Sequence, residues 1–286
     1  MAEHSRPFGV HSDGVALSGE RAGAGPAVVL LHGLTATRRY VLMGSRLLER
    51  SGYEVVSYDA RGHGHSAPAG MPSDYGYEHL ARDLEAVLDG LGLERAILAG
   101  ASMGAHTALR VALTAPERVT ALGLITPAYD PSAAAAAQDR GSWQALAAGL
   151  RQGGVEGFLR AYDFSAVPDR WRGTVERVIR QRLSAHEHPQ AVADALEVVP
   201  RSRPFATMAE LAAVEVPAVV VGSRDDADPG HPLVLAERYA AALPGAQLVV
   251  EPQDGSPIAW QGGRLSRVLA ELARRAGVAS AAADHT

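Results

Sequence analysis

Three amino acids are absent from this chain of 286 residues: lysine, asparagine and cysteine. All 27 basic residues are therefore arginines. Without lysine the chain has no Schiff-base amine, no Walker-type phosphate-binding lysine and no lysine to serve as a base beside a serine. Without cysteine it has no thiol nucleophile, thiolate metal site or disulfide, and without asparagine it has no acceptor for N-glycosylation. Covalent catalysis must then use serine, threonine, tyrosine, histidine or a carboxylate.

Long apolar runs and clusters of one charge are also lacking. The 32 acidic and 27 basic residues are interspersed and give a net charge of −5, so we expect no basic face for nucleic acid. No stretch of ~18 apolar residues occurs, and the first residues lack the apolar segment of a secretory signal. We expect a cytoplasmic protein that acts on a small molecule, without nucleic acid, membrane, cofactor or metal. The oligomeric state is not indicated.

Short apolar runs, rather than alternating patterns, carry the strand signal, which is typical of strands buried on both faces of a parallel sheet. The runs lie at residues 27–32, 54–59, 96–100, 121–126, 218–222 and 247–251. Helical patterns lie between them, at about residues 37–51, 76–91, 103–115, 231–243 and 260–276. One core-facing stripe stands out in the second pattern: Leu80, Leu84, Val87, Leu88 and Leu91. This alternation predicts an α/β fold with a mostly parallel sheet flanked by helices, and the turn signal Ser12-Asp13-Gly14 predicts a short antiparallel start.

The alternation stops between Asp130 and about Pro204, where helical patterns follow one another without a strand. We expect helices at about residues 132–151, 154–162, 170–184 and 188–199. The predicted organisation is an α/β core of residues 1–129 and 206–278, a helical cap of residues 130–205 and a flexible tail of residues 279–286. Three of the four phenylalanines and two of the three tryptophans lie in or beside the cap. They either cover a cleft at the carboxyl edge of the sheet or pack the cap against itself.

The first motif with chemical content is Gly100-Ala101-Ser102-Met103-Gly104. It follows a predicted strand and precedes a predicted helix, which is the setting of a nucleophile elbow. Small flanking residues are needed because the turn is strained and neighbouring backbone passes close to it. We expect Ser102 to present its hydroxyl at the end of the sheet, near the positive end of a helix dipole.

Two further segments follow predicted strands. His32-Gly33-Leu34 lies where a loop can direct a backbone N–H to the same point as the N–H of Met103, and two such donors form an oxyanion hole. We expect His32 to brace this loop through hydrogen bonds rather than to titrate. After the next strand, Asp59 and Arg61 are expected to pair with each other and hold their loop.

With these motifs in order, the chain resembles the α/β-hydrolase family from about residue 10 to residue 276. The matching segments are HG at 32–33, DARGHGHS at 59–66, GASMG at 100–104 and GSRDDADP at 222–229. The resemblance implies an α/β-hydrolase-type sheet with a helical cap insertion, a nucleophile at Ser102 and oxyanion donors at Leu34 and Met103. It also implies a triad acid after the next strand, at Asp225; Asp226 and Asp228 are near rivals, and Asp130 is a more distant one.

The chain departs from the family at the general base, a histidine in the loop after the last strand. That loop reads Pro252-Gln253-Asp254-Gly255-Ser256-Pro257, and no histidine lies between His231 and His285. A serine without a base is a poor nucleophile. His231, six residues beyond Asp225, is the best-placed replacement. His106, one turn beyond Ser102, is an alternative, as are His63 and His65 in a neighbouring loop.

Two functions follow from this departure. In the first, the chain is a serine-dependent hydrolase of a small, largely apolar carboxylic ester, lactone or thioester, with His231 as base and Asp225 or Asp228 as acid. In the second, the triad is lost, and the fold serves a non-hydrolytic epimerase-like or lyase-like enzyme or a ligand-binding pseudo-hydrolase.

Overall fold

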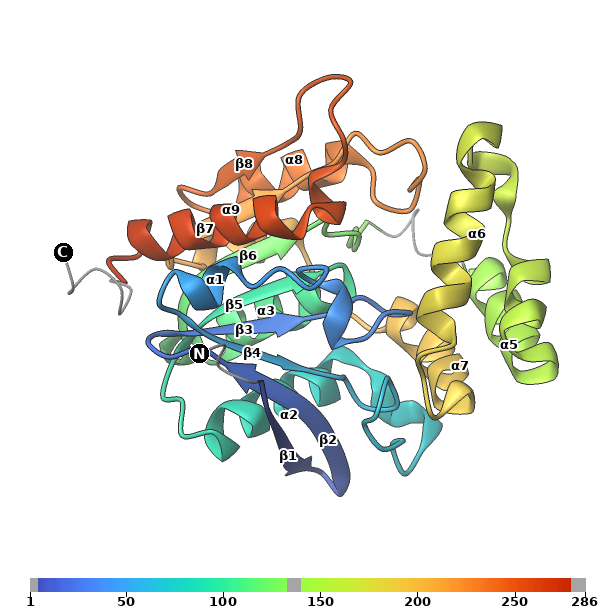
Figure 1. Cartoon of the computed structure of the whole chain (residues 1–286), viewed down its shortest axis with the longest axis horizontal. Coiled ribbons are helices and arrows are strands. Elements are labelled where there is room, and N and C mark those ends of the chain that lie inside the picture. Colours follow the sequence, from blue (N-terminus) through green and yellow to red (C-terminus); the bar gives the residue numbers. More distant parts are fainter. Residues whose placement is uncertain (1–4, 133–139, 279–286) are drawn as a thin grey trace.

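The computed structural model describes residues 5–132 and 140–278, and its framework is a twisted sheet in the strand order β1-β2-β4-β3-β5-β6-β7-β8 (Figure 1). Strands β3 to β8 pair in parallel, whereas β2 pairs antiparallel with both β1 and β4. The expected α/β fold with a mostly parallel sheet is therefore confirmed. The strands are β1 (Arg6–Ser12), β2 (Val15–Ala22), β3 (Ala27–Leu31), β4 (Glu54–Tyr58), β5 (Ala96–Ala101), β6 (Val119–Ile125), β7 (Ala218–Val221) and β8 (Gln247–Val249).

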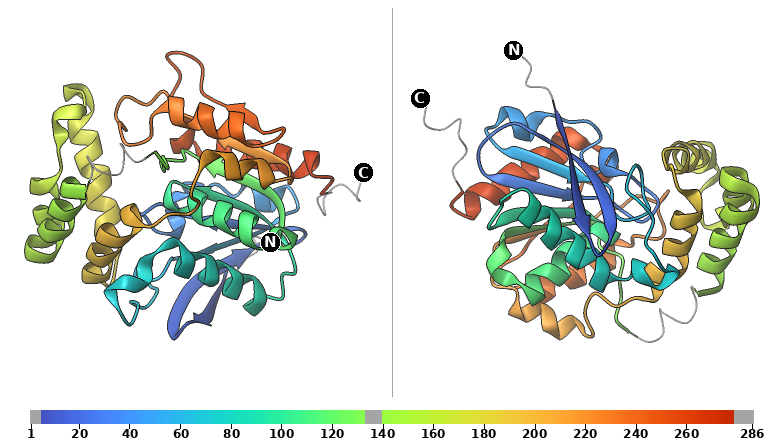
Figure 2. Two further views of the ribbon diagram at one scale, coloured as in Figure 1. Left: turned by 180° about the vertical axis from the view of Figure 1, so that it is seen from behind. Right: turned by 90° about the horizontal axis from the view of Figure 1, so that it is seen from below.

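Helices lie on both faces of this sheet (Figures 1 and 2). Helices α2 (Tyr77–Gly90), α3 (Met103–Thr114) and α8 (Leu233–Ala242) bury their apolar sides on one face, and α1 (Leu47–Arg50) and α9 (Gly262–Arg275) on the other. The short 3₁₀ helices are η1 (Arg38–Tyr40), η2 (Pro72–Tyr75), η3 (Pro116–Arg118), η4 (Phe164–Ala166), η5 (Val199–Arg201), η6 (Met208–Ala213) and η7 (Ile258–Trp260). No helix in the described part of the chain is long and apolar enough to cross a membrane.

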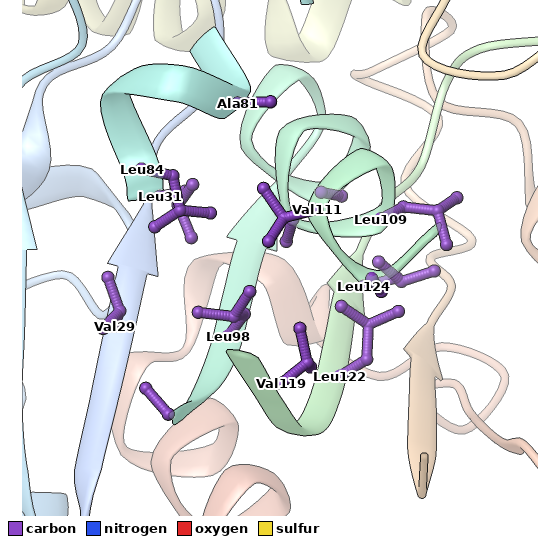
Figure 3. Close-up of a cluster of buried hydrophobic side chains, with 14 of the residues drawn as sticks. Val29, Leu31, Ala81, Leu84, Leu98, Leu109, Val111, Val119, Leu122 and Leu124 are labelled. Atoms are coloured by element: carbon purple, nitrogen blue, oxygen red, sulfur yellow. The ribbon is translucent and has the colours of Figure 1, made fainter. Parts of the chain in front are cut away.

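The core consists of two layers because alternate residues of each strand point to opposite faces. In β3, Val29 and Leu31 join the layer under α2 and α3, while Val28 and Leu30 join the layer under α1 and α9. Figure 3 shows the first layer between the central strands and helix α3. Both layers are apolar, which explains why the strands appear in the sequence as continuous apolar runs.

The elements predicted from the sequence are present with small shifts at their ends, with one exception. Residues 37–51 form only η1 and the short α1 instead of one helix. Met43 and Gly44 have φ angles of 48° and 78°, which lie in the left-handed region and interrupt a right-handed helix. At the start of the chain, Asp13 and Gly14 also have positive φ and close the predicted antiparallel hairpin.

Three helices between β6 and β7 stand beyond the ends to which the parallel strands point: α5 (Arg140–Ala161), α6 (Asp169–Leu183) and α7 (Pro189–Val198) (Figures 1 and 2). Gly153 and Gly154 break α5 into two limbs, as the two separate helical patterns predicted. The predicted helical residues 133–139 and the predicted tail of residues 279–286 lie outside the described residues. The boundaries of a separate cap stay a prediction.

The aromatic residues of this region have different surroundings. Phe158 is buried in the cluster formed by the three helices, and Phe205 is buried in the main core under α3 and α8. Trp171, in contrast, is 41% exposed. These aromatic side chains therefore do not form one common lining.

A buried ion pair ties the loop after β4 to helix α2. The guanidinium of Arg61 donates to both carboxylate oxygens of Asp83, at 2.7 and 2.6 Å, and to the backbone oxygen of Asp74 at 2.8 Å. Arg61 and Asp83 are almost inaccessible to solvent. The expected pairing of Arg61 with Asp59 is therefore wrong: Asp59 pairs with Arg38, and Arg61 reaches the helix instead.

We expect the Asp83→Asn variant to lose about 3–5 kcal/mol of unfolding free energy, because it leaves the buried Arg61 cation uncompensated. The matched control is Asp89→Asn on the same helix, where the exposed Asp89 pairs with Arg118 at 2.7 Å. That change should cost less than about 1 kcal/mol. Urea denaturation measures both values, and equal losses would contradict the assignment of the pair to the core.

Candidate active site

Ser102 lies at the sharp turn between β5 and α3 and has the backbone angles φ 50° and ψ −113°. This conformation is costly for a residue with a side chain, so the surrounding structure must hold it. A hydrogen bond from the backbone N–H of Ser102 to the backbone oxygen of Ile125, at 2.9 Å, helps to stabilise it. The side chain is half-buried, so the hydroxyl stays within reach of a small molecule.

The two glycines beside Ser102 allow this turn to pack closely. A Cβ on Gly100 would lie 2.5 Å from the backbone nitrogen of Ala105, and a Cβ on Gly104 would overlap the carbonyl group of Leu31. Backbone groups cannot give way as a flexible side chain can. The G-x-S-x-G spacing is thus a packing requirement of this turn.

His231 is the histidine that contacts Ser102. Its Nε2 lies 2.9 Å from Ser102 Oγ, and its Nδ1 lies 2.8 Å from each carboxylate oxygen of Asp228. A carboxylate only accepts hydrogen bonds, so Nδ1 carries the proton and Nε2 is left to accept from the serine hydroxyl. This Ser–His–Asp arrangement has the geometry of a catalytic triad.

The carboxylate at His231 is Asp228 rather than the first-choice Asp225. Asp225 instead accepts from Trp260 Nε1 at 2.9 Å and from the backbone of Ala227 at 3.0 Å. The structure therefore does not support the preference for Asp225. The other two rivals form ion pairs elsewhere, Asp226 with Arg170 and Asp130 with Arg238.

Nearby positive charge keeps Asp228 ionised. Burial raises the pKa of Asp228, but the charge and hydrogen bond of His231, together with the charge of Arg182, lower it by more. The pKa of Asp228 therefore lies below its ordinary value. An ionised carboxylate beside Nδ1 fixes the ring orientation and stabilises a positive imidazolium.

The loop after β3 approaches the same point from the other side. A Cβ on Gly33 would lie 3.5 Å from the Cβ of Ser102, so this loop runs directly beside the turn. Three histidines face three successive carbonyl oxygens of the loop: His32 Nδ1 faces Gly33 at 2.8 Å, His63 Nε2 faces Leu34 at 2.5 Å and His186 Nε2 faces Thr35 at 3.2 Å.

These contacts set the direction of the N–H groups in the loop. The carbonyl of Gly33 and the N–H of Leu34 belong to one trans peptide and point in opposite directions. Because the carbonyl points to His32, the Leu34 N–H points away from that ring. The N–H of Met103 belongs to the first residue of α3 and has no partner within the helix. The side chains of Leu34 and Met103 are both buried in the cluster formed with α5 and α7.

The match to a known protein family agrees with this geometry. The family model of the alpha/beta hydrolase fold matches residues 26–263. The chain belongs to the α/β hydrolase fold family.

Among relatives of this α/β hydrolase is a protein of Pseudomonas syringae pv. syringae named "Putative carbamate hydrolase RutD". It is 30% identical in an alignment that covers 79% of this chain and 84% of the length of the relative. A thermophilic esterase from Thermogutta terrifontis has a TM-score of 0.76 at 26% identity and covers 95% of this chain and 99% of its own. The enol-lactonase of Burkholderia xenovorans has a TM-score of 0.75 at 22% identity, and the match covers 93% of this chain and 100% of the enol-lactonase chain.

Two of the three alternative bases of this α/β hydrolase, His106 and His63, have other contacts. His106 Nε2 accepts from the backbone N–H groups of Ala128 and Tyr129, so its Nδ1 carries the proton and donates to Tyr77 Oη at 3.0 Å. Burial, with a smaller effect of the His231 charge, lowers the pKa of His106 to about 3. His63 is buried behind the loop of Leu34, and burial lowers its pKa as well.

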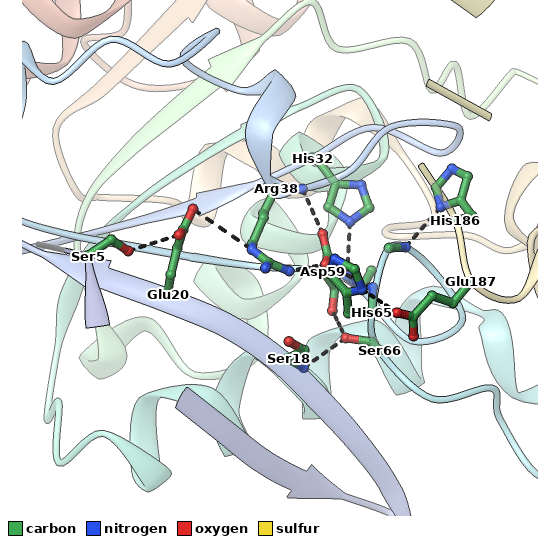
Figure 4. A network of polar contacts seen from close by, with 12 residues as sticks. Ser5, Ser18, Glu20, His32, Arg38, Asp59, His65, Ser66, His186 and Glu187 are labelled. Carbon is green, nitrogen blue, oxygen red and sulfur yellow. Dashed lines mark hydrogen bonds and ion pairs between the residues drawn. The ribbon is translucent and has the colours of Figure 1, made fainter. Parts of the chain in front are cut away.

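His32 has the bracing position that the sequence predicted. Its Nε2 accepts from the backbone of Ala60, while Nδ1 faces Gly33. Asp59 completes this support: it accepts from the backbone and guanidinium of Arg38 and from the backbone of His65 (Figure 4). His65 itself lies at the surface beside Glu187, 2.6 Å away.

Sequence reasoning missed His186 and Glu251. His186 follows α6 and accepts from Gly64 N at 2.9 Å, which links the helices after β6 to the loop after β4. Glu251 follows β8 and accepts from Ser223 Oγ and from the backbone of Arg224 and Ile258. Neither residue lies in a recognisable motif. Among the described residues, no three His, Asp or Glu side chains converge on a position that could hold a metal ion.

We expect the Gly104→Ala variant of this α/β hydrolase to unfold at a lower urea concentration and to lose about 3 kcal/mol, because the added Cβ overlaps the Leu31 carbonyl. The control is Gly173→Ala in helix α6, where nothing lies near the added atom. That variant should be neutral or more stable by roughly 0.5–1 kcal/mol. A Gly104→Ala protein of unchanged stability would show that the turn has room to relax.

Proposed function

We propose that this chain is a serine hydrolase that cleaves a small carboxylic ester, lactone or related acyl compound. Ser102 acts as nucleophile, His231 as general base and acid, and Asp228 as the carboxylate that orients His231. The observation that carries the proposal is the pair of contacts made by His231, at 2.9 Å to Ser102 Oγ and at 2.8 Å to Asp228. Both have the lengths that proton transfer and orientation require.

The reaction follows from these contacts. Ser102 Oγ attacks the carbonyl carbon of the substrate while its proton passes to His231 Nε2, and the carbonyl π electrons move to oxygen. The N–H groups of Leu34 and Met103 stabilise this oxyanion. When the oxyanion collapses, the bond to the leaving group breaks, and His231 returns the proton to the leaving oxygen.

Water then completes the cycle. It attacks the acyl-serine, gives one proton to His231 and forms a second oxyanion in the same place. Collapse of that intermediate releases the carboxylic acid, and His231 returns the proton to Ser102. Asp228 stays ionised throughout and stabilises the imidazolium formed in each half.

The names of the relatives support the same class of chemistry. A carbamate, an enol-lactone and an ester all carry a carbonyl carbon bonded to a heteroatom leaving group. This common feature supports acyl hydrolysis without selecting one substrate. The alternative of a fold without hydrolytic activity was based on the missing histidine after the last strand, and the contact of His231 with Ser102 supplies another base.

We expect a fluorophosphonate probe to label the folded chain at Ser102, because the reagent reacts with serines that a neighbouring base activates. Peptide mass spectrometry locates the adduct. Heat-denatured protein and the Ser102→Ala variant serve as controls, and both should stay unlabelled. Folded wild-type protein without an adduct at Ser102 would refute covalent catalysis.

The roles of the two aspartates separate cleanly in a matched pair of variants. Asp228→Asn should lower kcat/KM for a 4-nitrophenyl ester at least ~100-fold, because an amide at this position no longer fixes the proton on His231 Nδ1. Asp225→Asn, in the same loop, should stay within about threefold of wild type. His231→Ala should lose at least ~100-fold. A larger loss in Asp225→Asn than in Asp228→Asn would reverse the assignment of the acid.

A further inference from the structure

Arg182 lies in the last turn of helix α6, near the acid of the site. Its guanidinium carbon is 4.7 Å from the ring centroid of Trp260 and 5.4 Å from that of Tyr40. Tyr40 belongs to η1 and Trp260 to η7, so two separate loops beside the sheet supply the aromatic contacts. The cation is thus held between helix α6 and the sheet end, by contacts with ring faces.

This guanidinium has no anionic partner. Among the described residues it forms no ion pair and no hydrogen bond, and its Nε atom is buried without a partner. Other arginines of α6 are paired: Arg170 with Asp226, Arg172 with Asp169 and Arg180 with two glutamates. Arg38 has the one other buried unpartnered side-chain atom in the described chain, but Arg38 is paired through Asp59. A buried donor without an acceptor is rare in a folded protein, and a guanidinium that no anion in the described chain neutralises can pair with an anionic group of a bound molecule.

Arg182 lies close enough to Asp228 for its charge to act on that carboxylate. Its charge acts on Asp228 and on Tyr162, and it contributes to the low pKa of Asp228. Asp228 contacts His231 Nδ1 through both oxygens and forms no ion pair with Arg182, whose charge acts on it without direct contact. Arg182 is half-buried, so part of the side chain remains accessible.

We propose that Arg182 binds a carboxylate group of the substrate, so that the ester cleaved at Ser102 is an anionic one, such as a half-ester or lactone of a dicarboxylic acid. This inference names the substrate class of the proposed hydrolase and rests on that function. The guanidinium carbon lies over the two rings, and its N–H groups form no hydrogen bond among the described residues, so they can form two parallel N–H···O bonds with a planar carboxylate.

A carboxylate fits this place better than a phosphate. The loop beside Arg182 carries Asp225, Asp226 and Asp228, and Arg170 is already paired with Asp226. A dianion would meet stronger repulsion from these carboxylates than a monoanion. The guanidinium of Arg182 carries one positive charge, which the single negative charge of a carboxylate balances.

The test compares two substrates that differ in one charge. Mono-4-nitrophenyl adipate carries a free carboxylate at its far end, and methyl 4-nitrophenyl adipate has the same chain with that carboxylate methylated. Release of 4-nitrophenolate gives kcat/KM for each. We expect wild type to prefer the half-ester by at least about tenfold in this series or in the glutarate and suberate homologues, because a charge-assisted bidentate contact is lost on methylation.

Arg182→Gln should lower this preference ratio about tenfold, mainly through KM, since Arg182 acts in binding. Arg180→Gln is the control: it removes one positive charge from the same helix, at an exposed site paired with Glu156 and Glu176, and it should leave the ratio unchanged. Equal kcat/KM values for both members of every pair in wild type would overturn the proposal. So would equal ratios in wild type and Arg182→Gln.

A binding measurement separates this proposal from the proposed hydrolysis. In the Ser102→Ala variant, calorimetry with monomethyl adipate should show binding at least about tenfold tighter than with dimethyl adipate, and Arg182→Gln in that background should abolish the difference. If the binding difference is found but the wild-type protein cleaves neither nitrophenyl ester, hydrolysis is refuted and the carboxylate site is supported. If the Ser102→Ala variant binds the two methyl esters equally and the wild type cleaves both nitrophenyl esters alike, the carboxylate site is refuted and the proposed hydrolysis stands.

Discussion

The close approach of the turn after β5 to the end of β3 is the constraint on which the site depends. Gly100 and Gly104 face backbone atoms at distances that exclude any Cβ, so the chain can enter α3 only through a tight turn. Ser102 takes the positive φ that this turn demands. The strain is offset by packing in the core below, and the result is a fixed hydroxyl at the start of a helix. Any base must then come to Ser102, since Ser102 cannot move toward it.

Burial divides the histidines around the turn into two kinds. His32 and His186 are buried, and burial lowers their pKa values to about 4 and about 3, so both remain neutral at physiological pH. Neutral rings suit their task, because each accepts from one backbone N–H and donates to one carbonyl oxygen. His231 is partly exposed and contacts the nucleophile directly. Thus neutral rings hold the loop after β3 in place.

Local patterns in the sequence were sufficient for most of the fold and for the turn that holds Ser102, because apolar runs, helical periodicity and a G-x-S-x-G turn are short-range features. The sequence predicted His231 as the best-placed base because it lies six residues beyond Asp225 in the same loop, but it left His106, His63 and His65 as alternatives. The sequence could not show which aspartate contacts His231, because Asp225 and Asp228 are three residues apart and their contacts depend on how one loop turns. Asp83 was missed for another reason: it lies beside an apolar stripe, and only the chain-distant Arg61 explains a buried carboxylate there.

Asp228 and His231 lie in one loop, so their contact with each other depends mainly on how that loop turns. The backbone N–H of His231 donates to the backbone oxygen of Asp228 at 3.2 Å, so a local turn sets the relative position of the two residues. The remaining requirement is that the whole loop meet Ser102. Glu251, which follows β8, accepts from Ser223 and Arg224 at the start of this loop, and Trp260 donates to Asp225 in its middle. The segment after the last strand therefore has no histidine of its own, but it holds in place the loop that carries His231.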